Sequence, residues 1–167
     1  MNTAWLEPWE ATPPVPARVH VGFTEMVRFL RKEARAGRML PFVVTYQDRL
    51  VGQLTVGGLT WGSLASAHIG YWIDERVAGR GVMPTAVALA VDHSFRVVGL
   101  HRIEVNIRPE NEASLRVVEK LGLRDEGVRL RYLHIAGAWR DHRTFAVTAE
   151  EVGPDGLLGR WHRARTR

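Results

Sequence analysis

The segment from Gly70 to Thr85 constrains the fold most strongly, because its pattern predicts a strand, a glycine-marked loop and the start of a helix. Gly79 and Gly81 have no Cβ, so the backbone N–H groups of the loop can approach an anion closely. The helix that follows offers its own free N–H groups and the positive end of its dipole at the same place. The sequence therefore predicts a phosphate site at this strand-to-helix junction.

Two familiar phosphate-binding loops do not fit this spacing. The P-loop requires a lysine and then a serine or threonine after its last glycine, whereas Val82 and Met83 follow Gly81. The dinucleotide-binding loop requires a small residue where Pro84 stands. A Gly-x-Gly pattern also occurs in ordinary turns. The segments on either side must therefore decide which ligand the loop binds.

The composition is that of a single soluble domain. The chain has 167 residues, of which 46% are hydrophobic and 25% charged. It has no cysteine, which excludes disulfides and thiolate metal sites. The N-terminus lacks the pattern of a signal peptide, and the longest apolar run, Ala86 to Val91, is far too short to span a bilayer. We expect a cytoplasmic protein with no membrane partner.

The charge is concentrated at the C-terminus. The net charge is +5, and four arginines lie in the last eight residues, so the rest of the chain is nearly neutral. We expect residues 153–167 to form a basic, solvated and frayed tail. Such a tail could contact RNA electrostatically, but we expect no direct nucleic-acid role.

Hydrophobic periodicity and turn residues predict the order β-β-β-α-β-α-β-β after an N-terminal helical region. This order describes an α+β fold with a mixed central sheet and helices packed on its faces. The predicted elements are a broken helix and extended loop over residues 1–20, an amphipathic helix from Thr24 to Gly37, strands over 42–46, 50–56 and 67–73, a helix over 84–98, a strand over 102–108, a helix over 111–122 and a hairpin over 131–147.

The pattern Arg-x-x-Gly-x-Gly, from Arg76 to Gly81, resembles the pyrophosphate loop of the GCN5-related N-acetyltransferases (GNAT). Further segments resemble the ribosomal-protein alanine N-acetyltransferase (RimJ/RimL-type) branch of this superfamily, and together they cover nearly the whole chain. These segments are residues 5–10, 52–54, 99–104, 109–123 and 139–142.

The resemblance implies the acyl-CoA N-acyltransferase fold, with acetyl-CoA as cosubstrate. In this fold the fourth and fifth family strands splay apart and admit the pantetheine arm. By resemblance these strands are residues 71–73 and 102–108. Family members begin with a further strand and most of a helix, whereas four residues precede Trp5. We therefore expect one N-acetyltransferase domain over residues 1–152, lacking that strand and part of the first helix. The strand over 42–46 would then lie at an unprotected edge, which favours a homodimer.

The resemblance assigns cofactor binding to the strand, the loop and the helix that begins at Asn111. From the residues alone, Asn111 and Ser114 are an N-cap and an N3 residue. By resemblance, Asn111 instead holds the pantetheine and Ser114 donates a hydrogen bond toward the sulfur. The backbone N–H of Trp72 or Ile73 would stabilise the oxyanion. The full set is Tyr71, Trp72, Ile73, Arg76, Val77, Ala78, Gly79, Arg80, Gly81, Val82, Asn111, Ser114 and Lys120.

Acetyl transfer requires a neutral amine, and a protein α-amino group with a pKa near ~8 needs only mild base assistance. Glu104, on the polar side of its strand, is the first candidate for the base, and Glu10 is the second. Each is alternatively a surface carboxylate or a salt-bridge partner. A serine hydroxyl is too weak an acid to release a free proton, so Ser114 would orient or relay one to the sulfur. Tyr132 is a competing donor or an ordinary strand aromatic.

Trp9, Glu10, Tyr132 and His134 are the candidate acceptor-binding residues. His134, Asp141 and His142 could meet across the last hairpin, either as a structural contact or as part of the acceptor site. The histidines show no metal-ligand spacing, so no metal is expected.

The leading hypothesis is an acetyl-CoA-dependent N-acetyltransferase that acetylates a protein N-terminal α-amine, possibly of a ribosomal protein, by direct attack in a ternary complex. A second hypothesis keeps the fold and the cosubstrate but assigns a small amine, such as a polyamine, an amino sugar or an antibiotic, as acceptor. A third is a non-catalytic ribosome- or RNA-binding module that uses the arginine-rich tail.

Overall fold

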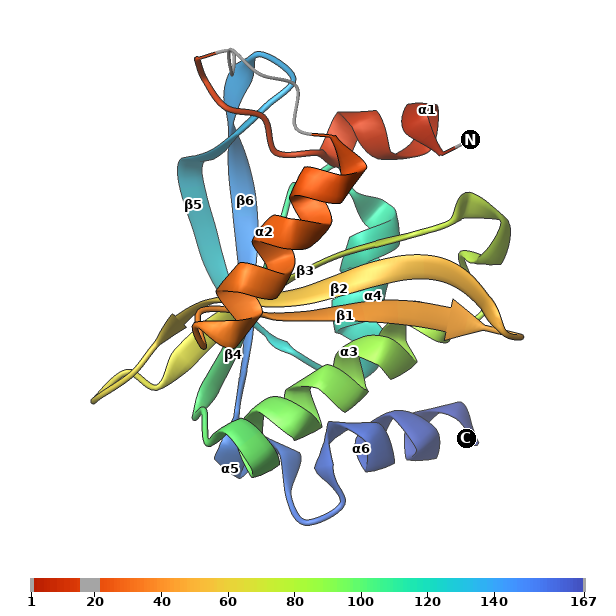
Figure 1. Cartoon of the computed structure of the whole chain (residues 1–167). Helices are drawn as coiled ribbons and strands as arrows, with labels where there is room; N and C mark the ends of the chain where they lie inside the picture. The colour runs from red at the N-terminus through yellow and green to blue at the C-terminus, as the bar shows by residue number, and fades with distance from the viewer. Residues whose placement is uncertain (1, 16–21, 167) are drawn as a thin grey trace.

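One six-stranded sheet organises the computed structural model, which describes residues 2–15 and 22–166 (Figure 1). Neighbouring strands are antiparallel except for one central parallel pair. The expected α+β fold with a mixed sheet is confirmed. In spatial order the strands are β1 (Leu40–Tyr46), β2 (Arg49–Thr60), β3 (Ser66–Ile73), β4 (Arg102–Ile107), β6 (Ala138–Thr148) and β5 (Arg124–Ile135).

Helices cover the sheet, and the core lies beneath α3 (Val82–His93) and α4 (Glu112–Leu121). Alternation along β4 buries Ile103, Val105 and Ile107 against these helices and directs the intervening residues to the other face. Figure 1 shows α4 behind the strands and α2 (Phe23–Arg35) crossing in front of them. The two faces of the sheet are therefore covered by different parts of the chain, as expected.

The parallel pairing of β3 with β4 ends after three residues on each strand. Ser66–His68 pair with Arg102–Glu104. Beyond this point the described pairs join β3 only to β2 and β4 only to β6, so the two strands diverge. The expected splay is confirmed at the expected pair of strands.

Several element boundaries differ from those expected. The amphipathic helix begins at Phe23 with Gly22 as its N-cap, where Thr24 was expected to cap it. The helix over 84–98 begins earlier, at Val82, and after His93 continues as a π-helical turn, η3 (Ser94–Val98). The Ser94 hydroxyl donates a 2.7 Å hydrogen bond to the Ala90 carbonyl, a contact that often bends helices.

The N-terminal segment starts with a short helix, α1 (Thr3–Leu6), and a 3₁₀ turn, η1 (Glu7–Trp9), as expected. The end of the expected extended loop, residues 16–20, lies outside the described residues. The last hairpin starts at Arg124, earlier than expected, because β5 continues the pairing with β6.

The expectation of a frayed C-terminal tail is wrong. After α5 (Ala149–Val152), residues Gly156–Arg165 form a helix, α6, that packs on α3 and α4. Leu157 and Trp161 are buried, and they lie four residues apart on one face of the helix. The four arginines had suggested a solvated tail, whereas burial of Leu157 and Trp161 fixes the segment against the protein body.

Asp92, on α3, caps the start of α6. Its carboxylate accepts hydrogen bonds from the backbone N–H groups of Leu157, at 2.7 Å, and Leu158, at 3.1 Å. A Cβ at Gly156 would meet this carboxylate at 2.5 Å, and the φ of Gly156 is +72°. Only glycine fits this position without strain.

β1 lies at the edge of the sheet, as expected, and pairing of this edge with a second chain stays a prediction. Within residues 2–15 and 22–166, no helix is long and apolar enough to cross a bilayer.

We predict that Asp92→Ala lowers the free energy of unfolding by about 1–2 kcal/mol, because two N–H groups of α6 lose their acceptor. Asp155→Ala is the matched control, since its exposed carboxylate forms a surface ion pair with Arg163 and should contribute less than about 1 kcal/mol. Urea denaturation measures both variants. Equal losses in the two variants would refute the capping role of Asp92.

Candidate active site

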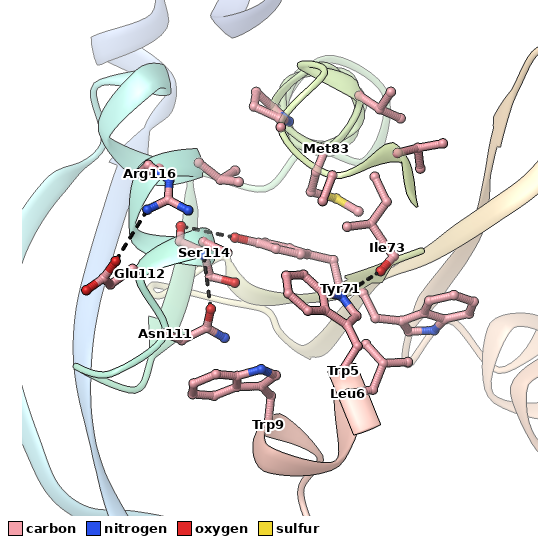
Figure 2. A pocket seen from close by; sticks show the side chains of 18 of the residues that line it. Trp5, Leu6, Trp9, Tyr71, Ile73, Met83, Asn111, Glu112, Ser114 and Arg116 are labelled. Carbon is pink, nitrogen blue, oxygen red and sulfur yellow. Dashed lines mark hydrogen bonds and ion pairs between the residues drawn. The ribbon is translucent and has the colours of Figure 1, made fainter. Parts of the chain in front are cut away.

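A cavity of about 660 Å³ lies where β3 and β4 diverge (Figure 2). Its walls come from the N-terminal segment, β2, β3, the glycine loop with the start of α3, and α4. The lining residues are Trp5, Leu6, Trp9, Glu10, Gln53, Thr55, Gly70, Tyr71, Trp72, Ile73, Val77, Ala78, Gly79, Gly81, Val82, Met83, Pro84, Glu110, Asn111, Glu112, Ala113, Ser114, Arg116, Val117 and Lys120.

The glycine loop has the geometry that the sequence predicts. Gly79 and Gly81 have φ angles of +79° and +82°, which only glycine adopts freely. Among the described residues, no acceptor bonds the backbone N–H groups of residues 79–83. These five consecutive N–H donors, at the loop and the start of α3, are therefore available to an anion at the helix N-terminus.

The C-terminal helix supports this loop from behind. The Trp161 indole N–H donates to the Thr85 hydroxyl at 3.0 Å, and that hydroxyl donates to the Gly81 carbonyl at 2.9 Å. Trp161 also lies 3.4 Å from where a Cβ on Gly81 would stand. The segment expected to be a free tail thus fixes the loop's position.

Asp74 holds the other end of the loop. Its carboxylate accepts from the Arg76 guanidinium at 3.0 and 2.5 Å and from the Arg76 backbone N–H at 2.9 Å. These hydrogen bonds hold the pKa of Asp74 well below its ordinary value. Because the Arg76 guanidinium is bonded to Asp74, it stabilises the conformation of the loop.

Neither Arg76 nor Arg80, both expected to hold phosphate, lines the cavity. Two cations on α4 line it instead, the expected Lys120 and the unexpected Arg116. They lie four residues apart and therefore share one face of the helix. This spacing was present in the sequence and could have identified Arg116.

Asn111 caps α4 as its residue type predicts, since its Oδ1 accepts from the Ser114 N–H at 3.1 Å. The Tyr71 hydroxyl crosses the cavity from β3 and donates to the Ser114 carbonyl at 3.4 Å (Figure 2). Burial raises the pKa of the Tyr71 phenol to about 12. Tyr71 and Ser114 thus bring two hydroxyl-bearing residues together in the cavity lining.

The N-terminal segment closes the opposite side of the cavity. The Trp5 indole N–H donates to the Ile73 carbonyl at 3.0 Å, which ties α1 to the end of β3. Arg108 lies over the Trp9 ring, 5.4 Å from its centroid, and donates to the Pro8 carbonyl at 2.8 Å. Trp9 and Glu10 therefore line the cavity, as expected of acceptor-binding residues.

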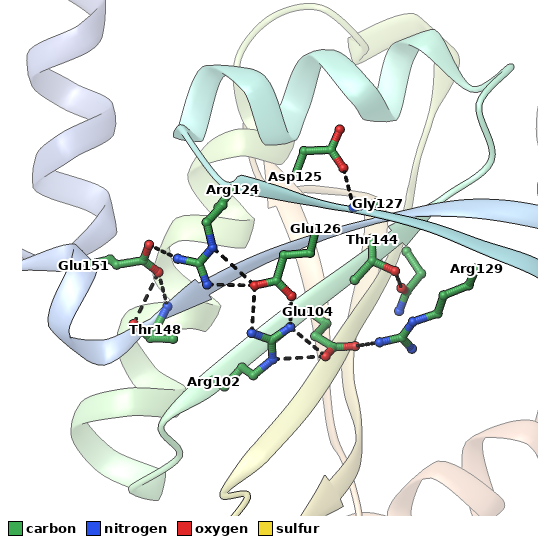
Figure 3. A network of polar contacts seen from close by, with 11 residues as sticks. Arg102, Glu104, Arg124, Asp125, Glu126, Gly127, Arg129, Thr144, Thr148 and Glu151 are labelled. Carbon is green, nitrogen blue, oxygen red and sulfur yellow. Dashed lines mark hydrogen bonds and ion pairs between the residues drawn. The ribbon is translucent and has the colours of Figure 1, made fainter.

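The structure does not bring Glu104 to the cavity. Its carboxylate lies in a polar network on the opposite face of the sheet from α3 and α4, where it accepts from Arg102 at 2.9 Å and from Arg129 at 2.6 Å (Figure 3). Glu126 joins this network through Arg102 and Arg124, which lower its pKa to about 2. With both oxygens paired to guanidinium groups, Glu104 is a structural ion-pair partner, and its assignment as the base is corrected.

Tyr132 and His134 also lie outside the cavity lining. The Tyr132 ring contacts His142 edge to face, with centroids 5.6 Å apart, and His134 hydrogen-bonds Thr12 at 2.9 Å. Asp141 accepts from the Arg131 backbone N–H. The expected meeting of His134, Asp141 and His142 therefore does not occur, because a register shift in the hairpin gives each its own partner.

Three carboxylates and two cations line the cavity. Glu10 and Glu110 come from the N-terminal segment and from the turn before α4, and Arg116 and Lys120 come from α4. Glu112, also on α4, pairs with Arg116 at 3.5 Å (Figure 2). The hydrogen bond from its own backbone N–H and the nearby Arg108 hold the pKa of Glu110 below its ordinary value. The cavity can therefore offer carboxylates to a cationic group and the cations of α4 to an anionic group.

Comparison with known proteins gives a consistent result. The family described as "Acetyltransferase (GNAT) domain" matches residues 2–124. The structure of Mycobacterium smegmatis RimJ in complex with CoA-disulfide is 44% identical, covers 98% of this chain and 79% of that chain, and has a TM-score of 0.89.

Two curated relatives extend this comparison. The [ribosomal protein uS5]-alanine N-acetyltransferase of Escherichia coli is 29% identical over 158 residues, which are 92% of this chain and 80% of that protein. The probable N-acetyltransferase YjcK of Bacillus subtilis is 41% identical over 100 residues, which are 60% of this chain and 55% of YjcK. The chain thus matches about half of the length of YjcK.

We predict that Asp74→Asn destabilises the protein in a pH-dependent way. The folded-state pKa of Asp74 is depressed, so its stabilisation is present above the ordinary aspartate pKa of about 4 and is lost as pH falls through the folded-state value. The difference in urea midpoint between wild type and variant should be largest near pH 7 and should shrink below pH ~4. Asp48→Asn, at an exposed turn, removes the same charge as a control. A constant difference from pH 3 to 7 would contradict the ion-pair explanation.

Proposed function

Because the chain belongs to the acetyltransferase (GNAT) domain family, we propose that it transfers the acetyl group of acetyl-CoA to the N-terminal α-amine of a protein. The observation that carries this proposal is the cavity through the β3–β4 splay, which has free loop amides at one end and carboxylates at the other. The relatives named for ribosomal-protein and uS5 alanine acetylation support a ribosomal-protein acceptor.

The residues present fit coenzyme A. The free N–H groups of residues 79–83 suit its diphosphate, and Arg116 and Lys120 add positive charge beside them. Within residues 2–15 and 22–166, the side of β3 that faces β4 has no strand partner beyond His68, so its backbone groups are available to the amides of a pantetheine arm. The solved relative with CoA-disulfide is consistent with this placement.

The acceptor would enter from the side of the N-terminal segment. Trp5 and Trp9 form an aromatic wall there, and Glu10 and Glu110 supply the negative charge that attracts an amine. Glu10 is exposed to solvent on this side, which suits the approach of the end of a peptide chain. A protonated small amine carries the same positive charge, so spermidine must be compared with a peptide as acceptor.

Acetyl-CoA supplies an activated thioester carbonyl to the reaction. Glu10, which lines the cavity with an exposed carboxylate, would accept the proton of the attacking amine through water. A backbone N–H of Trp72 or Ile73 would stabilise the developing oxyanion. The hydroxyls of Tyr71 and Ser114 would donate toward the departing sulfur.

The chain has no cysteine, and in the described residues no histidine or carboxylate contacts the Ser114 hydroxyl. A covalent acetyl-enzyme therefore lacks an activated nucleophile, which favours direct attack in a ternary complex.

We predict that the purified protein acetylates the α-amine of a peptide that begins with alanine. The test combines isotope-labelled acetyl-CoA with this peptide, with the same peptide blocked at its N-terminus but containing an internal lysine, and with spermidine. Mass spectrometry should find label only at the free N-terminus. Labelling of spermidine alone would support a small-amine acceptor, and no labelling of these acceptors or of a cell lysate would refute acetyl transfer.

We predict that Tyr71→Phe lowers kcat by about 10- to 100-fold while the KM for acetyl-CoA changes less than about threefold, because the variant loses one donor to the sulfur. Tyr132→Phe, which removes a hydroxyl outside the cavity, is the matched control and should retain kcat. Ser114→Ala measures the second donor.

The phenol of Tyr71 stays protonated through neutral pH, so its loss should lower the rate equally from pH 6 to 9. A Tyr71→Phe variant with unchanged kcat would exclude the phenol from this step.

A further inference from the structure

The outward face of α2 carries a concentrated positive charge that the proposed acetyl transfer does not use. Arg28, Arg31, Lys32 and Arg35 are all exposed. At 100° per residue they occupy one side of the helix, opposite the half-buried residues that face the sheet. From Arg28 to Arg35 the helix rises by seven steps of about 1.5 Å, so the four charges lie within about 10 Å along its axis.

These four cations have no acidic partner among the described residues. Glu33 stands between Lys32 and Arg35 in the sequence, but it is half-buried and pairs with Arg38 at 2.6 Å, beyond the end of α2. By contrast, the C-terminal arginines are used by α6. Arg160 donates to the carbonyl of Gly122, Arg163 pairs with Asp155 at 2.6 Å, and Arg165 lies over the Trp161 ring.

We propose that this face of α2 binds the phosphate backbone of a nucleic acid. Four closely spaced cations repel one another unless an anion of matching charge density lies across them. A nucleic-acid strand supplies such a row of phosphates, and the three guanidinium groups suit bidentate phosphate contacts. The proposal places on α2 a role that the sequence had suggested only for the tail.

The apolar side chains of α2 favour a nucleic acid over a lipid surface. A helix that lies in a membrane interface directs its apolar face into the lipid. Here the face that includes Val27, Leu30 and Ala34 is half-buried on the side of the protein body, and Figure 1 shows α2 lying across the sheet. Phe29, 53% exposed, borders the cationic face, and an aromatic ring beside cations can stack on a base.

The test measures binding of a fluorescein-labelled RNA hairpin and of a DNA duplex to the full chain by fluorescence anisotropy at 50, 100 and 200 mM KCl. Wild-type affinity should fall with salt. The double variant Arg31→Gln/Arg35→Gln should bind about 10-fold more weakly at 100 mM KCl. Its slope of log K against log salt should be smaller by about 1.4 to 1.8, since each lost phosphate contact contributes about 0.7 to 0.9. The ratio of RNA to DNA affinity identifies which nucleic acid is preferred.

Two controls separate this face from net charge. Arg163→Gln/Arg165→Gln removes the same charge from α6, which Figure 1 shows away from α2, and should bind within about twofold of wild type. Arg31→Lys/Arg35→Lys keeps the charge and should keep the salt slope. Circular dichroism verifies that each variant is folded.

Equal losses in the α2 and α6 double variants, or no binding of either nucleic acid at 50 mM KCl, would overturn the proposal. The proposal would also be overturned if the wild type bound polyglutamate, or vesicles with 30% phosphatidylserine, as tightly as the nucleic acids and the α2 double variant lost that binding too. The α2 variants should keep acetyl transfer to a free peptide. Failure of the nucleic-acid proposal is therefore distinguishable from failure of the proposed function.

Discussion

The early end of the parallel pairing between β3 and β4 is the constraint on which the rest of the structure depends. Three residues of each strand pair, and the strands then turn to β2 and β6. A closed sheet would have no passage at this point. The opening leaves unpaired backbone on β3, lets the Tyr71 hydroxyl reach α4, and places the glycine loop at the end of the same strand. The cavity thus arises from the pairing of the strands, and the side chains only line it.

The loop at one end of this opening depends on a segment far away in the sequence. Trp161 reaches Gly81 through the Thr85 hydroxyl, and Asp92 holds the start of the helix that carries Trp161. The loop is therefore fixed by α3 on one side and α6 on the other. A preorganised loop offers its N–H groups to an anion without first losing conformational entropy, so the C-terminal helix contributes to binding without touching the ligand.

The arginines fall into two groups according to their partners. Those near β4 and β5 pair with carboxylates, and this network holds both carboxylate oxygens of Glu104 on the face of the sheet opposite α3 and α4. Those on the outward face of α2 have no acidic partner among residues 2–15 and 22–166. In the cavity lining, Arg116 shares an exposed ion pair with Glu112, which lies beside it on α4. The same residue type therefore stabilises the fold in one place and remains available for ligands in others.

The sequence by itself determined the elements and the loop, because both depend on local physics. Period-two alternation placed β4, and the absence of a Cβ at Gly79 and Gly81 fixed the loop's positive φ angles. The splay followed from the resemblance, and the Asn111 cap followed from residue type.

Only the tertiary structure decided which side chains share the cavity. Glu104 had the residue type of a base, but Arg102, on the same face of β4, and Arg129, on β5, pair with both of its carboxylate oxygens. The C-terminal segment had the charge of a solvated tail, but burial of Leu157 and Trp161 outweighs that charge. Local patterns report backbone preference, whereas the partner of a charged side chain depends on long-range packing that no short segment contains.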